Sequence, residues 1–267
     1  DTQAARGRKK HAKTDRSDAR LMRELHQSGD LPESWIPPES VLEWRERVRL
    51  YKTLLDQRRM WIQRIHAELF QHGVSLPEAQ ISSPQTRQWL ASDEVQLSAA
   101  ARQRIAVGYH LIDATEAARS PLRADLDRFG RRQPACKALA AAHYGIGPLT
   151  AVVVWTELGD CRRFSRSAQV VRHTGLDVTV DSSDRHRSRG HLSRQGPETL
   201  RWALFEAGMA ASHATSPDRG YYQAVKQAHD GKLAAIGPTS SNDRHRASPC
   251  DGLHAAVNVH AGPRRRP

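Results

Sequence analysis

Residues 145–151 read GIGPLTA and continue directly into the apolar run VVVW at residues 152–155. Glycines let backbone N–H groups approach a phosphate closely, and the start of a following helix adds positive potential. Pro148 suits the first position of that helix. A Gly-x-Gly turn between two helices is typical of a helix-hairpin-helix contact with DNA, which makes Gly145 and Gly147 candidate nucleic-acid-binding residues. The same pattern is also typical of a tight turn that binds nothing.

A serine pair and an arginine-dense loop follow this turn. Ser182 and Ser183 precede the loop RHRSRGHLSR at residues 185–194, and Val178 to Val180 is expected to be a short extended segment. A serine becomes a nucleophile when a base or cations assist it, and arginines can neutralise the charge that develops on an attacked phosphodiester. Ser183 is therefore a candidate nucleophile, and the alternative is a basic loop that only contacts phosphates. The candidate nucleic-acid-binding arginines are Arg185, Arg187, Arg189, Arg194 and Arg201.

The charge of the chain indicates a polyanionic partner. The 267 residues carry 41 Lys and Arg against 29 Asp and Glu, a formal net charge of +12. Nucleic acid is favoured over a membrane surface, because arginine supplies most of the excess charge and prefers bidentate contacts to phosphate. No apolar run reaches the ~18 residues that a membrane span needs. The three cysteines have no CxxC spacing, which argues against a disulfide framework and a structural zinc site. The polar start, without the apolar core of a signal peptide, predicts a cytoplasmic protein.

Two long periodic segments predict a helical hairpin. From Glu39 to His72, apolar residues recur at spacings of three and four, with only Arg58 breaking the register. A second segment covers about residues 94–130, where Pro121 is expected to kink or split the helix. The hairpin is either an internal two-helix stalk or a dimerising coiled coil. Residues 134–230 are expected to form short helices, separated by Gly145, Gly159, Gly175, Gly196 and Gly220.

A short helix with two acidic residues is predicted near the start of the chain. It covers Asp15 to Gln27, with Asp15 as its N-cap and Asp18 in a capping box. The two carboxylates would share a helix face and could reach one divalent cation, while a two-metal nuclease site needs more ligands. Lys13 and Arg16 beside them are further candidate nucleic-acid-binding residues.

These motifs occur together in one known family. The sequence KTDRSDAR at residues 13–20 resembles the K-T-D-R-x-D-A motif near the end of the RuvC-like domain of DEDD insertion-sequence transposases. GIGPLTA resembles the start of their C-terminal transposase domain. The resemblance covers roughly residues 8–230, and its later matches, in the family's order, are Phe164, Gly175-Leu176, Ser182-Ser183, Arg189-Gly190, Arg194-Gln195-Gly196 and Leu200-Arg201.

The resemblance implies a mainly α fold in four parts. Residues 1–30 would be the end of a RuvC-like α/β domain, and residues 31–133 the helical hairpin or coiled coil. Residues 134–232 would form a helical, helix-hairpin-helix-like transposase domain. Residues 233–267 differ in composition and are expected to be a disordered, aberrant tail.

The resemblance also implies an activity, which is DNA transposition guided by a structured bridge RNA. Ser183 would be the nucleophile and would form a covalent phosphoserine link to a DNA end. Asp15 and Asp18 would be the last two acids of the DEDD set and would bind Mg²⁺. Because relatives combine the acids and the serine of different protomers in one site, a homo-oligomer, a dimer or a tetramer, is expected.

Three departures predict an N-terminally truncated copy, for which activity and inactivity both stay open. The first Asp and the Glu of the family would lie before residue 1, Asp184 stands where the family usually has glycine, and an unrelated tail follows Lys232. The alternative from another class is a non-catalytic helix-hairpin-helix nucleic-acid-binding module. A third is a coiled-coil interaction protein whose charge only confers solubility.

Overall fold

A computed structural model describes residues 15–29, 35–75, 80–164, 166–179, 182–183, 186–187 and 191–228. The described part of the chain is mainly helical, which confirms the predicted fold class. The chain divides into two compact units, of which the first ends at Pro38 and the second begins at Glu39. The predicted tail at residues 233–267 lies outside the described residues.

The first unit contains helix α1 (Asp15–Ser28), which confirms the predicted N-terminal helix. Asp15 is its first helical residue instead of its N-cap. Asp15 and Asp18 both lie in the first turn, where a negative charge interacts favourably with the helix dipole.

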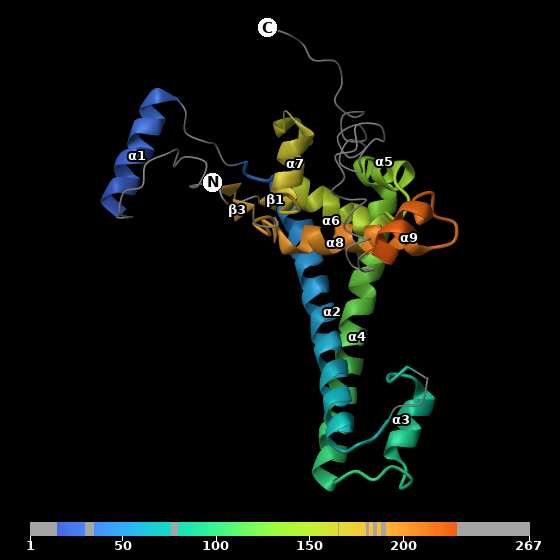
Figure 1. Ribbon diagram of the computed structural model, residues 1–267. Coiled ribbons are helices and arrows are strands. Elements are labelled where there is room, and N and C mark those ends of the chain that lie inside the picture. The colour runs from blue at the N-terminus through green and yellow to red at the C-terminus, as the bar shows by residue number, and fades with distance from the viewer. Residues whose placement is uncertain are drawn as a thin grey trace. The chain divides into compact units, whose positions relative to one another are not determined.

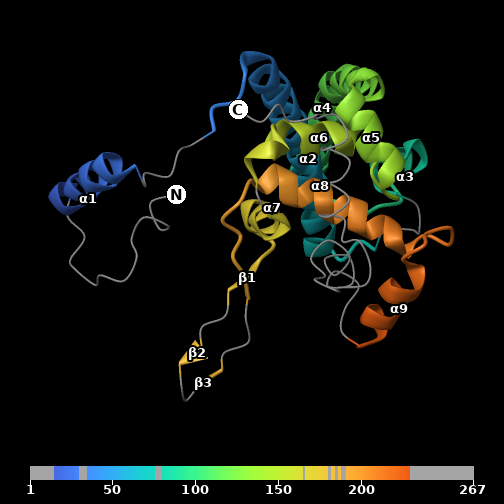
Figure 2. The same ribbon diagram turned by 90° about the horizontal axis from the view of Figure 1, so that it is seen from above.

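The second unit is built on a long helical hairpin of α2 (Glu39–Gln71) and α4 (Ala99–Arg132). The two helices lie side by side in both views (Figures 1 and 2). The predicted seam of α2 is used for this pairing, since it contributes the buried residues Val41, Val48, Tyr51, Ile65 and Leu69. This burial corresponds to an internal two-helix stalk, and dimerisation through the hairpin stays a prediction.

Helix α4 differs from its prediction at two points. It begins at Ala99 instead of about residue 94, because the Ser98 hydroxyl accepts a hydrogen bond from the amide of Ala101 (3.1 Å) and caps the helix there. Of the two effects expected at Pro121, a kink or a split, the split does not occur, since α4 continues to Arg132, and the kink stays a prediction. A proline removes one backbone hydrogen bond and introduces a clash, and burial on both sides of it, at Ile112 and Leu126, favours the continuous helix.

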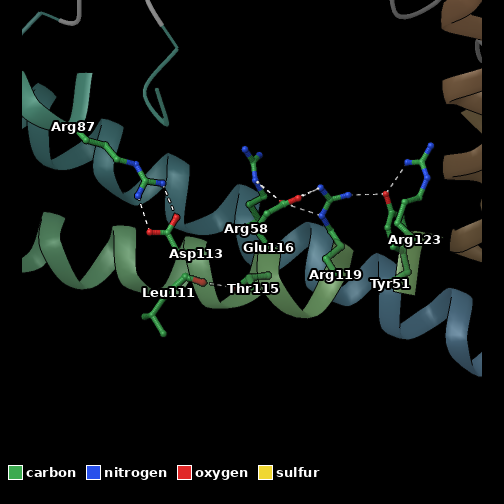
Figure 3. Close-up of polar contacts among 9 residues, drawn as sticks. All are labelled: Tyr51, Arg58, Arg87, Leu111, Asp113, Thr115, Glu116, Arg119 and Arg123. Atoms are coloured by element: carbon green, nitrogen blue, oxygen red, sulfur yellow. Dashed lines mark hydrogen bonds and ion pairs between the residues drawn. The ribbon is translucent and has the colours of Figure 1, made fainter. Parts of the chain in front are cut away.

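A short helix between the two long ones was not predicted. Helix α3 (Pro84–Ala91) starts with Ser83 as N-cap and Pro84 at the first helical position. The guanidinium of Arg87 binds both carboxylate oxygens of Asp113 on α4, each at 2.7 Å (Figure 3). The Tyr109 hydroxyl also donates to the carbonyl oxygen of Ile81 at 2.7 Å. These contacts attach α3 and the segment before it to the hairpin.

At the other end of the hairpin, short helices surround a buried central helix, α6 (Pro148–Leu158). Its apolar run VVVW makes α6 the centre of the main core, and Val152, Val153 and Val154 are at most 1% exposed. Gly220 lies inside α9 and is therefore no separator between helices, in contrast to the prediction. The surrounding helices are α5 (Pro134–Ala142), η2 (Cys161–Arg163), α7 (Ser167–Thr174), α8 (Glu198–Met209), η3 (Ala210–Ser212) and α9 (Arg219–Ala228).

Candidate nucleic-acid interface

The predicted Gly-x-Gly turn connects α5 to α6, and its two glycines have different surroundings. Gly145 has a φ of +85°, and a Cβ atom there would lie 2.5 Å from the carbonyl oxygen of Ala207 on α8. Gly147 is the exposed N-cap of α6, and a Cβ atom there would have nothing within 4 Å. Gly145 therefore allows close packing, whereas the backbone at Gly147 is open to a ligand.

The first turn of α6 opens onto a small hollow in the surface. Its volume is about 270 Å³. The N–H groups of a first helical turn have no acceptor within the helix, so they add positive potential to this hollow. Two guanidinium groups and two aromatic side chains contribute to its walls, which are formed by Tyr51, Leu55, Arg59, Arg123, Gly147, Pro148, Leu149, Thr150, Trp202, Ala203 and Glu206.

A row of polar side chains runs along the hairpin from this hollow (Figure 3). The buried Tyr51 hydroxyl accepts hydrogen bonds from Arg119 Nη1 (2.9 Å) and Arg123 Nη1 (3.1 Å). Arg119 also binds Glu116, whose carboxylate lies 3.4 Å from Arg58 Nε. Arg58, which breaks the apolar register of α2, thus has a carboxylate partner on α4.

The serine pair and the arginine-dense loop belong to an arm that contains two pairs of short antiparallel strands (Figure 2). Strand β1 (Val178–Thr179) pairs antiparallel with β4 (His191–Leu192), which confirms the predicted extended segment. Farther along the arm, β2 (Ser182–Ser183) pairs antiparallel with β3 (His186–Arg187). Ser183 is opposite His186 in this register, so the candidate nucleophile directly precedes the two residues that connect the strands.

The base of the arm is held by close backbone contacts. Gly175 has a φ of +71°, and Gly196 passes close beside it. The Ser193 amide donates to the carbonyl oxygen of Asp177 (2.9 Å), and the Ser193 hydroxyl donates to the Asp177 carboxylate. Arg194 adopts a positive φ of 53°, and its amide donates to the carbonyl oxygen of Gly175 (3.0 Å). The direction in which the arm leaves the helices is therefore fixed at its base.

The predicted arginines have different positions. Arg194 is exposed at the base of the arm. Arg201 donates to the carbonyl oxygen of Gly196, which gives it a structural contact that its sequence pattern did not indicate. Arg187 lies in β3, while Arg185 and Arg189 lie outside the described residues.

The predicted acidic residues lie on α1, in the first unit. Asp15 and Arg16 are exposed and Asp18 is half-buried, and Lys13 lies outside the described residues. Within the described ranges, no group of three His, Cys, Asp or Glu side chains could hold a metal ion. Asp15 and Asp18, separated by one helical turn, form a pair of carboxylates. Mg²⁺ is commonly held by one or two carboxylates together with water and substrate oxygens, so the pair fits that ion.

A buried carboxylate that the sequence analysis missed attaches α6 to the hairpin. Glu157 is 3% exposed, and its two carboxylate oxygens lie 3.6 Å from the Nε atoms of Arg45 and Arg49 respectively. Arg45 also donates to the carbonyl oxygen of Thr156 through Nε (3.0 Å) and Nη2 (2.6 Å). The only sequence signal was a lone glutamate at the end of an apolar helix.

His173 on α7 lies next to this cluster. Its Nε2 atom is 3.3 Å from Arg163 Nη2, and its ring lies 5.4 Å from that of Phe164. Burial, followed by the positive charges of Arg163 and Arg45, lowers the pKa of His173 from its ordinary value of 6.5. A neutral imidazole at this position is therefore favoured.

The two described cysteines are packing residues, as expected for Cys161. Burial raises the pKa of Cys136 to about 12 and that of Cys161 to about 11. Both thiols are thus protonated at neutral pH and are not nucleophiles. No helix in the described ranges combines the length and apolar character that crossing a bilayer requires.

Comparison with known proteins points to one class. Residues 137–223, from α5 to α9, match the transposase family described as IS116/IS110/IS902. The chain is also 25% identical over 194 residues to the protein named "Putative transposase y4qE" of Sinorhizobium fredii (strain NBRC 101917 / NGR234). That alignment covers 73% of this chain and 47% of the relative, so the chain spans about half the length of the relative. Both comparisons support a relationship to the transposases of insertion elements.

Proposed function

We propose that this chain binds the DNA of an insertion element and takes part in its transposition. The observation that carries the proposal is that one segment, residues 137–223, both matches the transposase family and contains the two features suited to DNA. These are the open turn at Gly147 and the arm that bears Ser183. The net charge of +12 supports a polyanionic partner.

The chemistry that we propose is attack by Ser183 on a DNA phosphodiester. The serine oxygen forms a bond to phosphorus while the bond from phosphorus to the departing DNA oxygen breaks, and the serine proton passes to a base or to solvent. Arginines of the arm would neutralise the charge that develops on the phosphoryl oxygens. Mg²⁺ would be held by Asp15 and Asp18 and would supply further charge neutralisation. A structured guide RNA and a second copy of the chain are proposed as partners on the family resemblance.

A second candidate is a nucleic-acid-binding module without chemistry. It is favoured by the hollow beside α6, because that site is complete without Ser183. Asp184 also favours this second candidate, because its negative charge directly follows Ser183, where a phosphate would approach.

Trapping of a covalent adduct separates the two candidates. The chain is incubated with Mg²⁺, labelled DNA that contains element ends, and the guide RNA, and is then analysed under denaturing conditions. We expect an adduct that Ser183→Ala abolishes and that the neighbouring Ser182→Ala retains, with loss also in Asp15→Asn and Asp18→Asn. Salt-sensitive DNA binding without any adduct would favour the module, and DNA binding that is absent or independent of salt would contradict both candidates.

A further inference from the structure

The hollow at the start of α6 has two chemically different sides. Arg123 and the first turn of α6 supply positive charge and N–H donors, whereas Glu206 and Trp202 supply a carboxylate and an aromatic ring. A phosphate alone would use only the first side and would be repelled by the carboxylate. The volume of about 270 Å³ is just below the ~300–1,000 Å³ that is usual for small-molecule sites, so the hollow has room for no more than one base with its phosphate.

The side chains on the aromatic side are held in place. Trp202 Nε1 donates to Glu206 Oε1 at 3.1 Å, which fixes the indole ring. Arg59 Nη2 contacts the same carboxylate oxygen at 3.5 Å, and Lys52 Nζ lies 5.6 Å from the centroid of the Trp202 ring. A fixed aromatic ring stacks on a nucleobase at a small entropic cost.

On the cationic side, Arg123 is also held in place. Its Nε donates to Asp127 (2.8 Å) and its Nη1 to the Tyr51 hydroxyl (3.1 Å). A guanidinium group has five N–H donors, so these two bonds leave donors for a phosphate oxygen. Its side chain is 45% exposed, which makes it accessible to a strand.

We propose that this hollow binds one unpaired nucleotide, with the base on Trp202 and Glu206 and the phosphate on Arg123 and the start of α6. The inference rests on the proposed nucleic-acid binding and adds a specificity to it. A carboxylate accepts hydrogen bonds from exocyclic amino groups, as it does from cytosine N4. In a duplex both faces of a base are stacked on its neighbours, so stacking on Trp202 selects a base that is unpaired. The carboxylate favours an amino group over the carbonyl oxygen that thymine and uracil carry at the same position.

Binding of single-stranded oligonucleotides tests the site. The probes are oligothymidylates with one central 2-aminopurine, cytosine or thymine, the corresponding RNA strands, and a mixed-sequence duplex. We expect quenching of 2-aminopurine fluorescence, tighter binding of the cytosine probe than of the thymine probe, and loss of that preference in Glu206→Gln. Comparison of the DNA probes with the RNA probes identifies which kind of strand supplies the nucleotide. Equal affinity of the unaltered chain for the cytosine and thymine probes would overturn the inference.

A matched pair of arginines provides the control. Arg123 and Arg128 lie on the same helix, and each is paired with an aspartate, but only Arg123 lines the hollow. Arg123→Ala should weaken single-strand binding about tenfold, as expected for the loss of one charge-assisted contact, while Arg128→Ala should change it little. Equal effects of Arg123→Ala and Arg128→Ala on single-strand binding would overturn the site, even if the chain binds duplex DNA. If the unaltered chain does not bind duplex DNA at all, the proposed function itself is overturned. Trp202→Phe should retain the quenching that Trp202→Leu loses, with thermal melting as the check on folding.

Discussion

Gly175 and Gly196 lie against each other where the arm leaves the helices, so closely that a Cβ atom on Gly175 would be 2.6 Å from the amide nitrogen of Gly196. A Cβ atom on Gly196 would in turn meet the backbone of His173 and Thr174. Because backbone atoms are met on both sides, neither position has room for a side chain. The contact holds the two ends of the segment that carries Ser183.

Alanine at Gly196 should disturb this crossing. We expect Gly196→Ala to lower the free energy of unfolding by about 1–3 kcal/mol, since backbone must move to accommodate the methyl group. Gly220→Ala is the control, because a Cβ atom there has nothing within 4 Å and alanine favours a helix. Urea unfolding of both variants measures the difference, and equal stabilities would show that the crossing is not tight.

Substitution of the two glycines of the GIG turn should affect different properties, stability at Gly145 and DNA binding at Gly147. Gly145→Ala should destabilise the fold by about 1–3 kcal/mol, because it combines a positive φ with a clash against Ala207. Gly147→Ala should leave the melting temperature nearly unchanged and weaken DNA binding, because the methyl group keeps a phosphate away from the start of α6. Melting and DNA titration of both variants check this, and a loss of stability only in Gly147→Ala would reverse the assignment.

Glu157 should be costly to neutralise. Removing one partner of a buried ion pair leaves an unpaired charge, so Glu157→Gln should lower the free energy of unfolding by about 3–5 kcal/mol. Glu43 and Arg47 form an exposed pair on the same hairpin, and Glu43→Gln should cost under about 0.5 kcal/mol. Chemical unfolding measures both. A small cost at Glu157 would mean that Arg45 and Arg49 are stabilised well enough without the carboxylate.

Stability should fall in mild acid because of His173. The pKa of the folded state is lowered below the ordinary value of 6.5, so below that pH the unfolded chain binds a proton that the folded chain does not. Stability from this residue is complete above pH 6.5 and decreases as the pH falls toward the lowered pKa. Urea unfolding at about pH 7.5 and about pH 5.5 measures the decrease. His173→Gln should reduce it, whereas substitution of the exposed His66 should not.

Local sequence patterns were sufficient for most elements of the fold. The heptad spacing of α2 predicted its length and its buried face, and the run after Gly147 predicted the helix that became the core. Of the two effects expected at Pro121 the split does not occur, and α3 was missed, because both outcomes depend on packing against other parts of the hairpin. A local signal for α3 was present in the pair Ser83 and Pro84, which caps and starts the helix.

The sequence by itself determined the helical class, the net positive charge and the order of the motifs, because these depend on composition and on spacing along the chain. Only the tertiary structure decided what each residue contacts. It assigned a packing role to Gly145 and an open position to Gly147, paired the lone Glu157 with Arg45 and Arg49, and brought Arg123 and Trp202 to one hollow. The physical reason is that burial and contact join segments far apart in the chain, and no local pattern encodes which of them meet.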